Sequence, residues 1–228
     1  MRFRSFIIAY ALVLAILLFA DRRPSSVPQD RYSHVVDLTD GQRSSNPGGR
    51  TRIVAPGALI PGTWAAGQIP SERLIAPLIV MDVKAGPSGD SQISLDDIAA
   101  WETQHGMIPQ GAVVAIRCSA APAGSSQNDG WQANDARTAF PVEREAAQFL
   151  MEARYAIGFA AETPLSLASD RTLARQLALH GVYVVEGAAG FHFLPATGSL
   201  IIVAPAKVAS AKDKTAGEAP VRVLAMVR

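Results

Sequence analysis

Short apolar runs alternate with segments of helical periodicity along most of the chain, and this pattern constrains the fold more than any other feature. The runs have the length of buried strands, and the segments between them place apolar residues at helical spacing. The predicted strands cover residues 34–38, 75–84, 112–117, 156–161, 182–185, 200–204 and 221–227, and the predicted helices cover 94–105, 143–154 and 171–179. Strands that alternate with helices predict an α/β domain.

The first predicted helix carries a start and a stop signal. Ser94 is followed three residues later by Asp97, which resembles a capping box with Asp in place of the usual Glu or Gln. Gly106 is a typical residue just after a helix end. Polar or charged stretches between the predicted elements, at 39–52, 119–137 and 207–219, are predicted to be loops.

The composition excludes several classes of protein. Of 228 residues, 49% are hydrophobic and 18% are charged, which is enough to bury a core and too apolar for a disordered chain. The formal net charge is +1, from 21 basic and 20 acidic residues, so no nucleic-acid partner is predicted. The single cysteine, Cys118, excludes an internal disulfide and a cysteine-based zinc site.

The N-terminus has the pattern of a targeting segment. Two arginines within residues 1–4 precede the uncharged apolar run 6–20, which is shorter than the roughly 20 residues of a full membrane span. Ala20 suits a cleavage site and Leu18 does not, so a cleaved signal peptide and a retained anchor both stay open. We therefore expect residues 1–20 to direct export, residues 21–33 to form a linker, and membrane contact only through residues 6–20.

Cysteine and histidine offer weak candidates for chemistry. Cys118 follows a predicted buried strand and could act as a nucleophile with His105 or His192 as its base, although core packing is the commoner role of such a cysteine. His180 precedes Gly181 at a predicted helix end, where a histidine commonly stabilises the last carbonyl groups.

Glu186 is the most unusual residue, because it follows the apolar strand Val182–Val185 directly. A carboxylate at the end of a buried strand is unfavourable unless it is paired or bound to a metal. An ion pair at the strand tip and a ligand-binding or catalytic role are both compatible with its position.

Several segments, taken in order, resemble the cyclase family, whose members include bacterial kynurenine formamidase and related metal-dependent amide and lactone hydrolases. The segments are HVVDLTD, IPSERLIAPLIVMDV, SLDDIAAWETQHGMIPQGAVVAIR, FPVEREAAQFLMEAR, HGVYVVEG, LPATGSLIIVAPAKV and APVRVLAMV. The resemblance covers residues 34–228. It implies the swivelling β/β/α fold of that family, with a mixed sheet or barrel-like core and a shortened N-terminal part, and often a homo-oligomer.

The resemblance also implies where a metal site would lie. The family motif, His-x-Gly-Thr-His-x-Asp-x-Pro-x-His, together with a distant His and a distant Glu, holds one or two divalent metals, zinc or manganese. Thr51, Ala55 and Pro56 match its anchors. The ligand positions differ: they carry Gly48, Arg52, Val54 and Ala58 in the motif and Ala174 in place of the distant His, and Glu186 alone is retained. Glu162 replaces the Asp of a family turn.

These departures predict that no metal or other cofactor is bound. We expect Arg52 and Glu186 to form the ligand-binding site, with the guanidinium pairing with the Glu186 carboxylate where the family places a cation. This hypothesis requires the two side chains to lie within hydrogen-bond distance.

Three functions stay open at this point. The first is an exported, non-catalytic or altered family member that binds a small ligand, or that assembles with itself or with an active paralogue. The second is an arylformamidase-type hydrolase with a rebuilt metal site, for which the candidate ligands are Glu186, His180, His192 and Glu162. The third is a membrane-tethered interaction protein.

Overall fold

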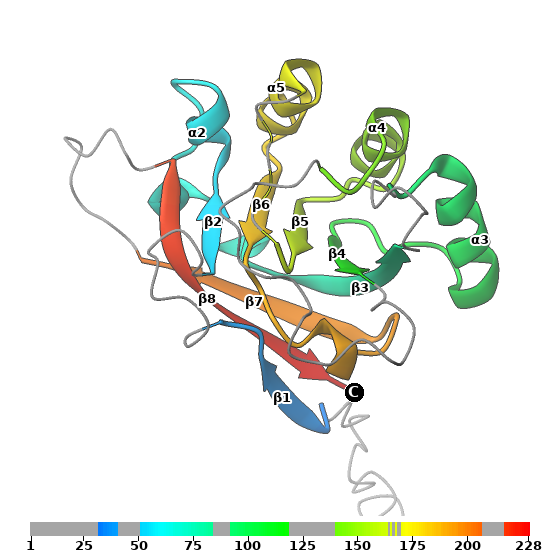
Figure 1. Ribbon diagram of the computed structural model, residues 1–228. Helices are drawn as coiled ribbons and strands as arrows, with labels where there is room; N and C mark the ends of the chain where they lie inside the picture. The colour runs from blue at the N-terminus through cyan, green and yellow to red at the C-terminus, as the bar shows by residue number, and fades with distance from the viewer. Residues whose placement is uncertain are drawn as a thin grey trace, which may run out of the picture. The chain divides into compact units, whose positions relative to one another are not determined.

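A closed mixed sheet with helices along one side forms the domain (Figure 1). The computed structural model describes residues 32–40, 51–83, 92–118, 140–163, 165, 167, 170–206 and 217–228. Within these residues the strands are β1 His34–Asp37, β2 Arg52–Val54, β3 Ile75–Val83, β4 Val113–Cys118, β5 Gly158–Ala161, β6 Tyr183–Glu186, β7 Ser199–Pro205 and β8 Glu218–Val227.

The strands follow the order β1-β8-β2-β6-β5-β4-β3-β7, and an additional pairing of β7 with β8 closes a ring of seven. Strands β3, β4, β5 and β6 run parallel to one another, whereas β2 and β7 pair antiparallel to their neighbours. The long strand β8 pairs with β2 near its start and with β1 near its end. This mixed, barrel-like α/β architecture confirms the predicted fold class.

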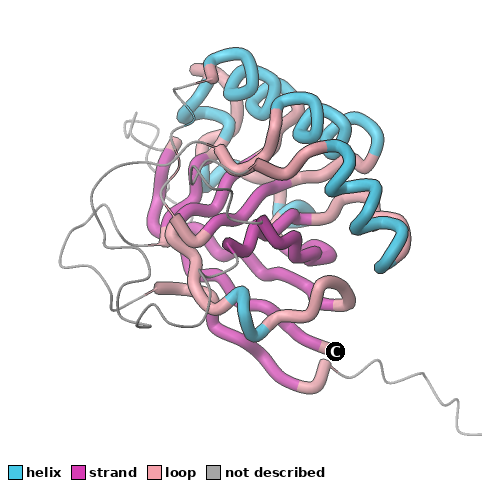
Figure 2. The backbone as a smooth tube through the Cα atoms, turned by 45° about the vertical axis from the view of Figure 1, so that its right-hand side comes forward, coloured by secondary structure: helices cyan, strands magenta, loops and turns pink. Residues whose placement is uncertain are grey.

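The helices form a layer over the parallel strands (Figure 2). They are α2 Pro56–Leu59, α3 Leu95–His105, α4 Arg144–Ala153 and α5 Arg171–Leu179. The described residues also form short 3₁₀ turns outside this layer: η2 Ala66–Gln68, η3 Ser71–Arg73 and η5 Phe191–Phe193. The predicted capping box of α3 is present: the Ser94 hydroxyl accepts from the Asp97 N–H at 3.2 Å, and the Asp97 carboxylate accepts from the Ser94 N–H at 2.9 Å. Gly106 follows with a φ of 88°, which favours glycine.

Alternation along the strands divides the apolar residues into two cores. The helix-side core lies between sheet and helices and includes Val54, Ile116, Phe159 and Val184 from the strands and Leu150, Leu173 and Leu177 from the helices. The barrel core lies inside the ring and includes Ile53, Val113, Ala115, Tyr183 and Val185. Successive residues of a strand therefore face the two cores in turn.

The sequence prediction was wrong at two places in the sheet. Residue 52 was assigned to a loop, but it opens β2, whose three residues are too few to show an alternating pattern. The last strand begins at Glu218 rather than at Val221, because residues 218–220 pair with β2. Short α2 was also not predicted. The expected loop at 119–137 and most of that at 207–219 lie outside the described residues.

No helix in the described part of the chain has the length and apolar character needed to cross a membrane. The apolar run 6–20 and residues 21–31 of the predicted linker 21–33 lie outside that part. The targeting role expected of the N-terminus therefore stays a prediction.

Candidate functional site

Charged residues gather where the parallel strands end. Asp82 and Arg117 lie near the carboxyl ends of β3 and β4, Glu162 follows β5, and Glu186 ends β6. Because these four strands are parallel neighbours, their carboxyl ends lie at the same edge of the sheet. That edge is where α/β sheets commonly place their ligands.

Arg52 and Glu186 pair directly across β2 and β6. The two residues are opposite each other in the antiparallel register. The Arg52 Nε and Nη2 atoms donate to Glu186 Oε2 at 2.8 and 2.6 Å, so the predicted hydrogen-bond contact is present. The Glu186 side chain is 2% exposed and that of Arg52 is 18% exposed. Burial makes this contact stronger than an ion pair in water and makes the loss of either partner costly.

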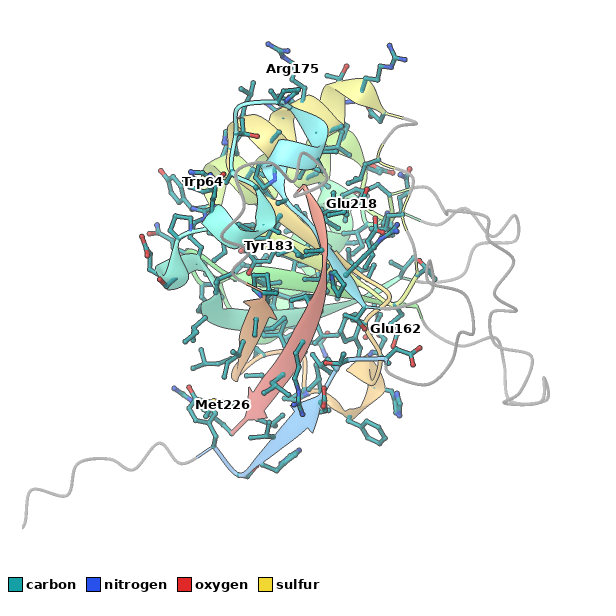
Figure 3. All side chains as sticks on the ribbon, turned by 90° about the vertical axis from the view of Figure 1, so that its left-hand side faces the viewer. Trp64, Glu162, Arg175, Tyr183, Glu218 and Met226 are labelled. Carbon is teal, nitrogen blue, oxygen red and sulfur yellow. The ribbon has the colours of Figure 1, made fainter. Side chains whose placement is uncertain are left out.

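A second carboxylate approaches Arg52 from the other side. Glu218 lies at the start of β8 (Figure 3), and its Oε2 is 3.5 Å from Arg52 Nη1. The Glu218 side chain is 41% exposed, so this contact is weaker than that with Glu186. The guanidinium therefore links three adjacent strands, β6, β2 and β8, at one place.

Thr51 fixes the strand that carries Arg52. Its hydroxyl donates to the Gly187 carbonyl at 2.6 Å and accepts from the Asp40 N–H at 2.7 Å. Thr51 itself is buried. This side chain therefore holds the entry to β2 against the residue that follows Glu186, which aligns the Arg52–Glu186 pair.

Four of the positions at which the resemblance places metal ligands lie on the helix side of the sheet: those of Arg52, Val54, Ala174 and Glu186. Val54 and Val184 belong to the helix-side core, so Arg52 and Glu186, two residues away on the same strands, face the helices as well. Ala174 of α5 packs against the same core. Gly48 lies outside the described residues. Ala58 is exposed on α2, where its backbone approaches Gly217 closely.

The second charged pair lies on the opposite side of the sheet edge. Arg117 binds Asp82 through Nε at 2.6 Å and Nη2 at 2.9 Å, in a bidentate arrangement. Its Nη1 also donates to the carbonyls of Phe191 and Leu194, at 3.1 and 3.2 Å. The hydrogen bond to Asp82 is the main reason that the pKa of Arg117 is raised, with the nearby charge of Glu162 as a smaller cause. Arg117 thus anchors the segment after β6.

Sequence analysis did not single out this pair. The residues were visible as opposite charges at the ends of two predicted strands, but their proximity depends on β3 and β4 being neighbours. The register places Asp82 directly beside Arg117.

Of the ligands suggested for a rebuilt metal site, Glu162 and Glu186 lie at the same sheet edge, at the ends of the neighbouring strands β5 and β6, but the two histidines do not complete a ligand set with them. His180 caps the C-terminal end of α5, before β6 begins, whereas Glu186 is the last residue of β6, so the two lie at opposite ends of the strand. The His180 ring is 3.9 Å from Glu152 instead. His192 is exposed on η5, with its ring against Phe193. Among the described residues, no group of three or more His, Cys, Asp or Glu side chains is placed to hold a metal ion.

The proposed Cys118–His105 pair is also separated. His105 ends α3, before β4 begins, and Cys118 is the last residue of β4. The His105 ring packs on Trp101, with 4.9 Å between ring centroids. The two positions therefore lie toward opposite ends of this six-residue strand.

Comparison with known proteins agrees with this architecture. Residues 24–166 match the cyclase family model, described as "Putative cyclase". No curated protein sequence matches the chain. The fold is similar to isatin hydrolase A from Labrenzia aggregata bound to benzyl benzoate, with a TM-score of 0.68 and 23% identity, covering 85% of this chain and 93% of that one.

Two other solved structures show the same likeness. Isatin hydrolase A from Ralstonia solanacearum has a TM-score of 0.61 and 24% identity, covering 86% of this chain and 81% of that one. A structure described as a potential metal-dependent hydrolase with cyclase activity has a TM-score of 0.59 and 22% identity, covering 86% of this chain and 98% of that one. At these identities the likeness shows the fold.

Proposed function

This chain belongs to the cyclase family, and we propose that it is a member that works without a divalent metal, as a small-ligand-binding protein rather than a hydrolase. The observation that carries the proposal is the Arg52 guanidinium hydrogen-bonded to the buried Glu186 carboxylate. In this proposal a permanent side-chain cation takes the position that the family gives to a metal ion.

The charge at this position argues against a bound dication. Arginine stays protonated at any pH at which the protein is folded. A divalent ion bound to Glu186 would have to displace the guanidinium from a contact of 2.6 Å or lie beside its positive charge. Both arrangements are unfavourable in a site with little solvent.

The described side chains near Glu186 supply too few ligands, since Glu218 contacts the other side of Arg52, Glu162 follows the neighbouring strand β5, and no third ligand joins them. Val54 and Ala174 share the helix-side core with Glu186 and have no donor atoms in their side chains. Catalytic zinc sites use three protein ligands and keep one position open for water. The described residues around Glu186 therefore do not fit a catalytic metal ion.

Metal analysis combined with turnover assays tests the proposal. Purified protein is incubated with zinc or manganese, desalted, and assayed for bound metal and for hydrolysis of isatin and of an aryl formamide. We expect well under one equivalent of metal and no turnover above the metal-only reaction. One tightly bound equivalent, together with turnover that is lost in Glu186→Gln, contradicts the proposal and favours the rebuilt hydrolase.

We also propose that residues 1–20 export the domain, so that it works outside the cytoplasm, and that it associates with itself or with an active paralogue. Fractionation of cells that express the full chain tests export. A truncation that starts at Asp21 is the matched control, and equal recovery of both proteins from the cytoplasm contradicts the proposal.

Sedimentation of the purified protein tests self-association.

A further inference from the structure

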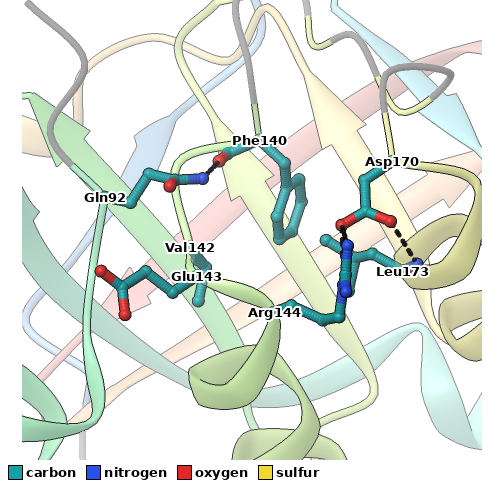
Figure 4. A pocket seen from close by; sticks show the side chains of 7 residues that line it. All are labelled: Gln92, Phe140, Val142, Glu143, Arg144, Asp170 and Leu173. Atoms are coloured by element: carbon teal, nitrogen blue, oxygen red, sulfur yellow. Dashed lines mark hydrogen bonds and ion pairs between the residues drawn. The ribbon is translucent and has the colours of Figure 1, made fainter.

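A pocket opens between the first turns of α4 and α5 (Figure 4). Its volume is about 310 Å³, at the lower end of the range for small-molecule sites. Its lining comes from the segments before the two helices and from their first turns: Gln92, Phe140, Val142, Glu143, Arg144, Asp170 and Leu173. All of these residues lie in the described part of the chain.

The inner wall of the pocket is apolar. Phe140, Val142 and Leu173 line it, and all three side chains are buried members of the helix-side core. The Phe140 ring packs edge-on against Phe159 of β5, with 5.2 Å between centroids. The side chains of this wall are 1–4% exposed, and an apolar body in the pocket would contact the part of them that faces it.

The charges at the rim are not balanced. Arg144 and Asp170 neutralise each other through an ion pair of 2.8 Å, and the other Asp170 oxygen accepts from the Thr172 and Leu173 N–H groups at the start of α5. Within the described residues, the exposed Glu143 carboxylate makes no hydrogen bond or ion pair, although it precedes α4 directly. Among the described residues, no cation neutralises this negative charge at the rim.

From this combination we infer that the pocket binds a small ligand with an apolar body and a protonated amino group. The apolar body lies against Phe140, Val142 and Leu173, and the ammonium pairs with the Glu143 carboxylate. The amide oxygen of Gln92, whose nitrogen donates to the Phe140 carbonyl at 2.7 Å, provides a second acceptor at the rim. Neither Arg52 nor Glu186 lines this pocket, so the inference adds a second site and its ligand class to the proposed binding function, on which it rests.

Binding of 2-phenylethylamine tests this assignment, with 3-phenylpropionate as a probe of the same shape and opposite charge. Titration is followed by the chemical shifts of the protein's methyl and amide groups. We expect the amine to bind with a dissociation constant on the order of 1 mM. Its ring should give nuclear Overhauser contacts to the methyl groups of Val142 and Leu173, and the carboxylate probe should bind at least about fivefold more weakly.

Reversal of one charge provides the sharpest comparison. Glu143→Lys should weaken binding of the amine by at least about tenfold and strengthen binding of 3-phenylpropionate. Glu145→Lys is the matched control, since Glu145 is an exposed acidic residue in the first turn of α4 that does not line the pocket. This control should leave the affinity within about twofold of that of the unchanged protein.

Two results overturn the inference: no shift of Val142 or Leu173 signals at high millimolar amine, or equal effects of the two Lys variants. A thermal melt of each variant shows that it folds, so a loss of binding is attributable to the changed charge. These outcomes are separate from those of the metal and turnover assays. A protein that binds no metal and no amine retains the proposed function but loses the assigned pocket.

Discussion

Removal of the Arg52 guanidinium should destabilise the domain far more than removal of a surface arginine. In Arg52→Met the methylene chain is largely kept, but the Glu186 carboxylate, 2% exposed, loses two hydrogen bonds and its counter-charge. Loss of one partner from a buried pair costs about 3–5 kcal/mol, and the 18% exposure of Arg52 places this site near the lower value. For a domain of this size, about 3 kcal/mol corresponds to a fall in Tm of roughly 6–12 °C.

Urea unfolding followed by circular dichroism measures the effect in four proteins: the unchanged chain, Arg52→Met, Glu186→Leu and the double variant. The double variant removes both charges, so it should be more stable than Arg52→Met alone, with an interaction energy of at least about 2 kcal/mol in the cycle. Arg222→Met is the control, because Arg222 and Asp37 form a pair whose side chains are 68% and 46% exposed. Its expected cost is below about 1 kcal/mol.

The reasoning is refuted if Arg52→Met and Arg222→Met destabilise the fold equally, or if the cycle gives no interaction energy. Either result would mean that the Arg52–Glu186 contact contributes no more than an exposed ion pair. The contact would then no longer support the proposal that Arg52 replaces a metal ion at this site.

Three other perturbations test different parts of the fold. Gly158→Ala should cost about 1–3 kcal/mol in urea unfolding, because the added Cβ would lie 2.7 Å from the Cε2 atom of the buried Tyr183 ring; a change under about 0.5 kcal/mol contradicts this packing. The hydrogen bond from Arg154 is the main reason that the pKa of Glu102 lies below its ordinary 4.5. The contact between Glu102 and Arg154 therefore stabilises the folded state fully above pH 4.5, and this stabilisation is lost as pH falls through the lowered pKa of the folded state. Glu102→Gln should therefore lower the free energy of unfolding at neutral pH and change it little at about pH 2. An effect of the same size at both pH values contradicts this assignment. Arg117→Met should speed amide hydrogen exchange in residues 190–194, and unchanged protection there would show that the arginine does not anchor that segment.

The sequence predicted the elements better than their arrangement. The three longer helices and the longer strands were found because their apolar residues repeat with a clear period. The three-residue strand β2 has no such repeat. Closure of the ring depends on the pairing of β7 with β8, a long-range contact that no local pattern specifies.

The candidate site was predictable in part. The contact between Arg52 and Glu186 could be expected because a family resemblance placed both positions at one metal site, and the register confirms their proximity. The Arg117–Asp82 pair was missed because it requires the strand order. His180 was wrongly grouped with Glu186, although its place before β6 already put it at the other end of that strand.

The position of β8 has a consequence for how the molecule is made. This strand contacts β1 and β2 along one edge and β7 along the other, yet it comes last of the strands that the described residues form. Until residues 218–227 have left the ribosome, the edges of β2 and β7 have backbone N–H and C=O groups without their hydrogen-bond partners in β8. These two edge strands can associate with other chains. Loss of these ten residues should therefore yield an aggregating product rather than a smaller folded one.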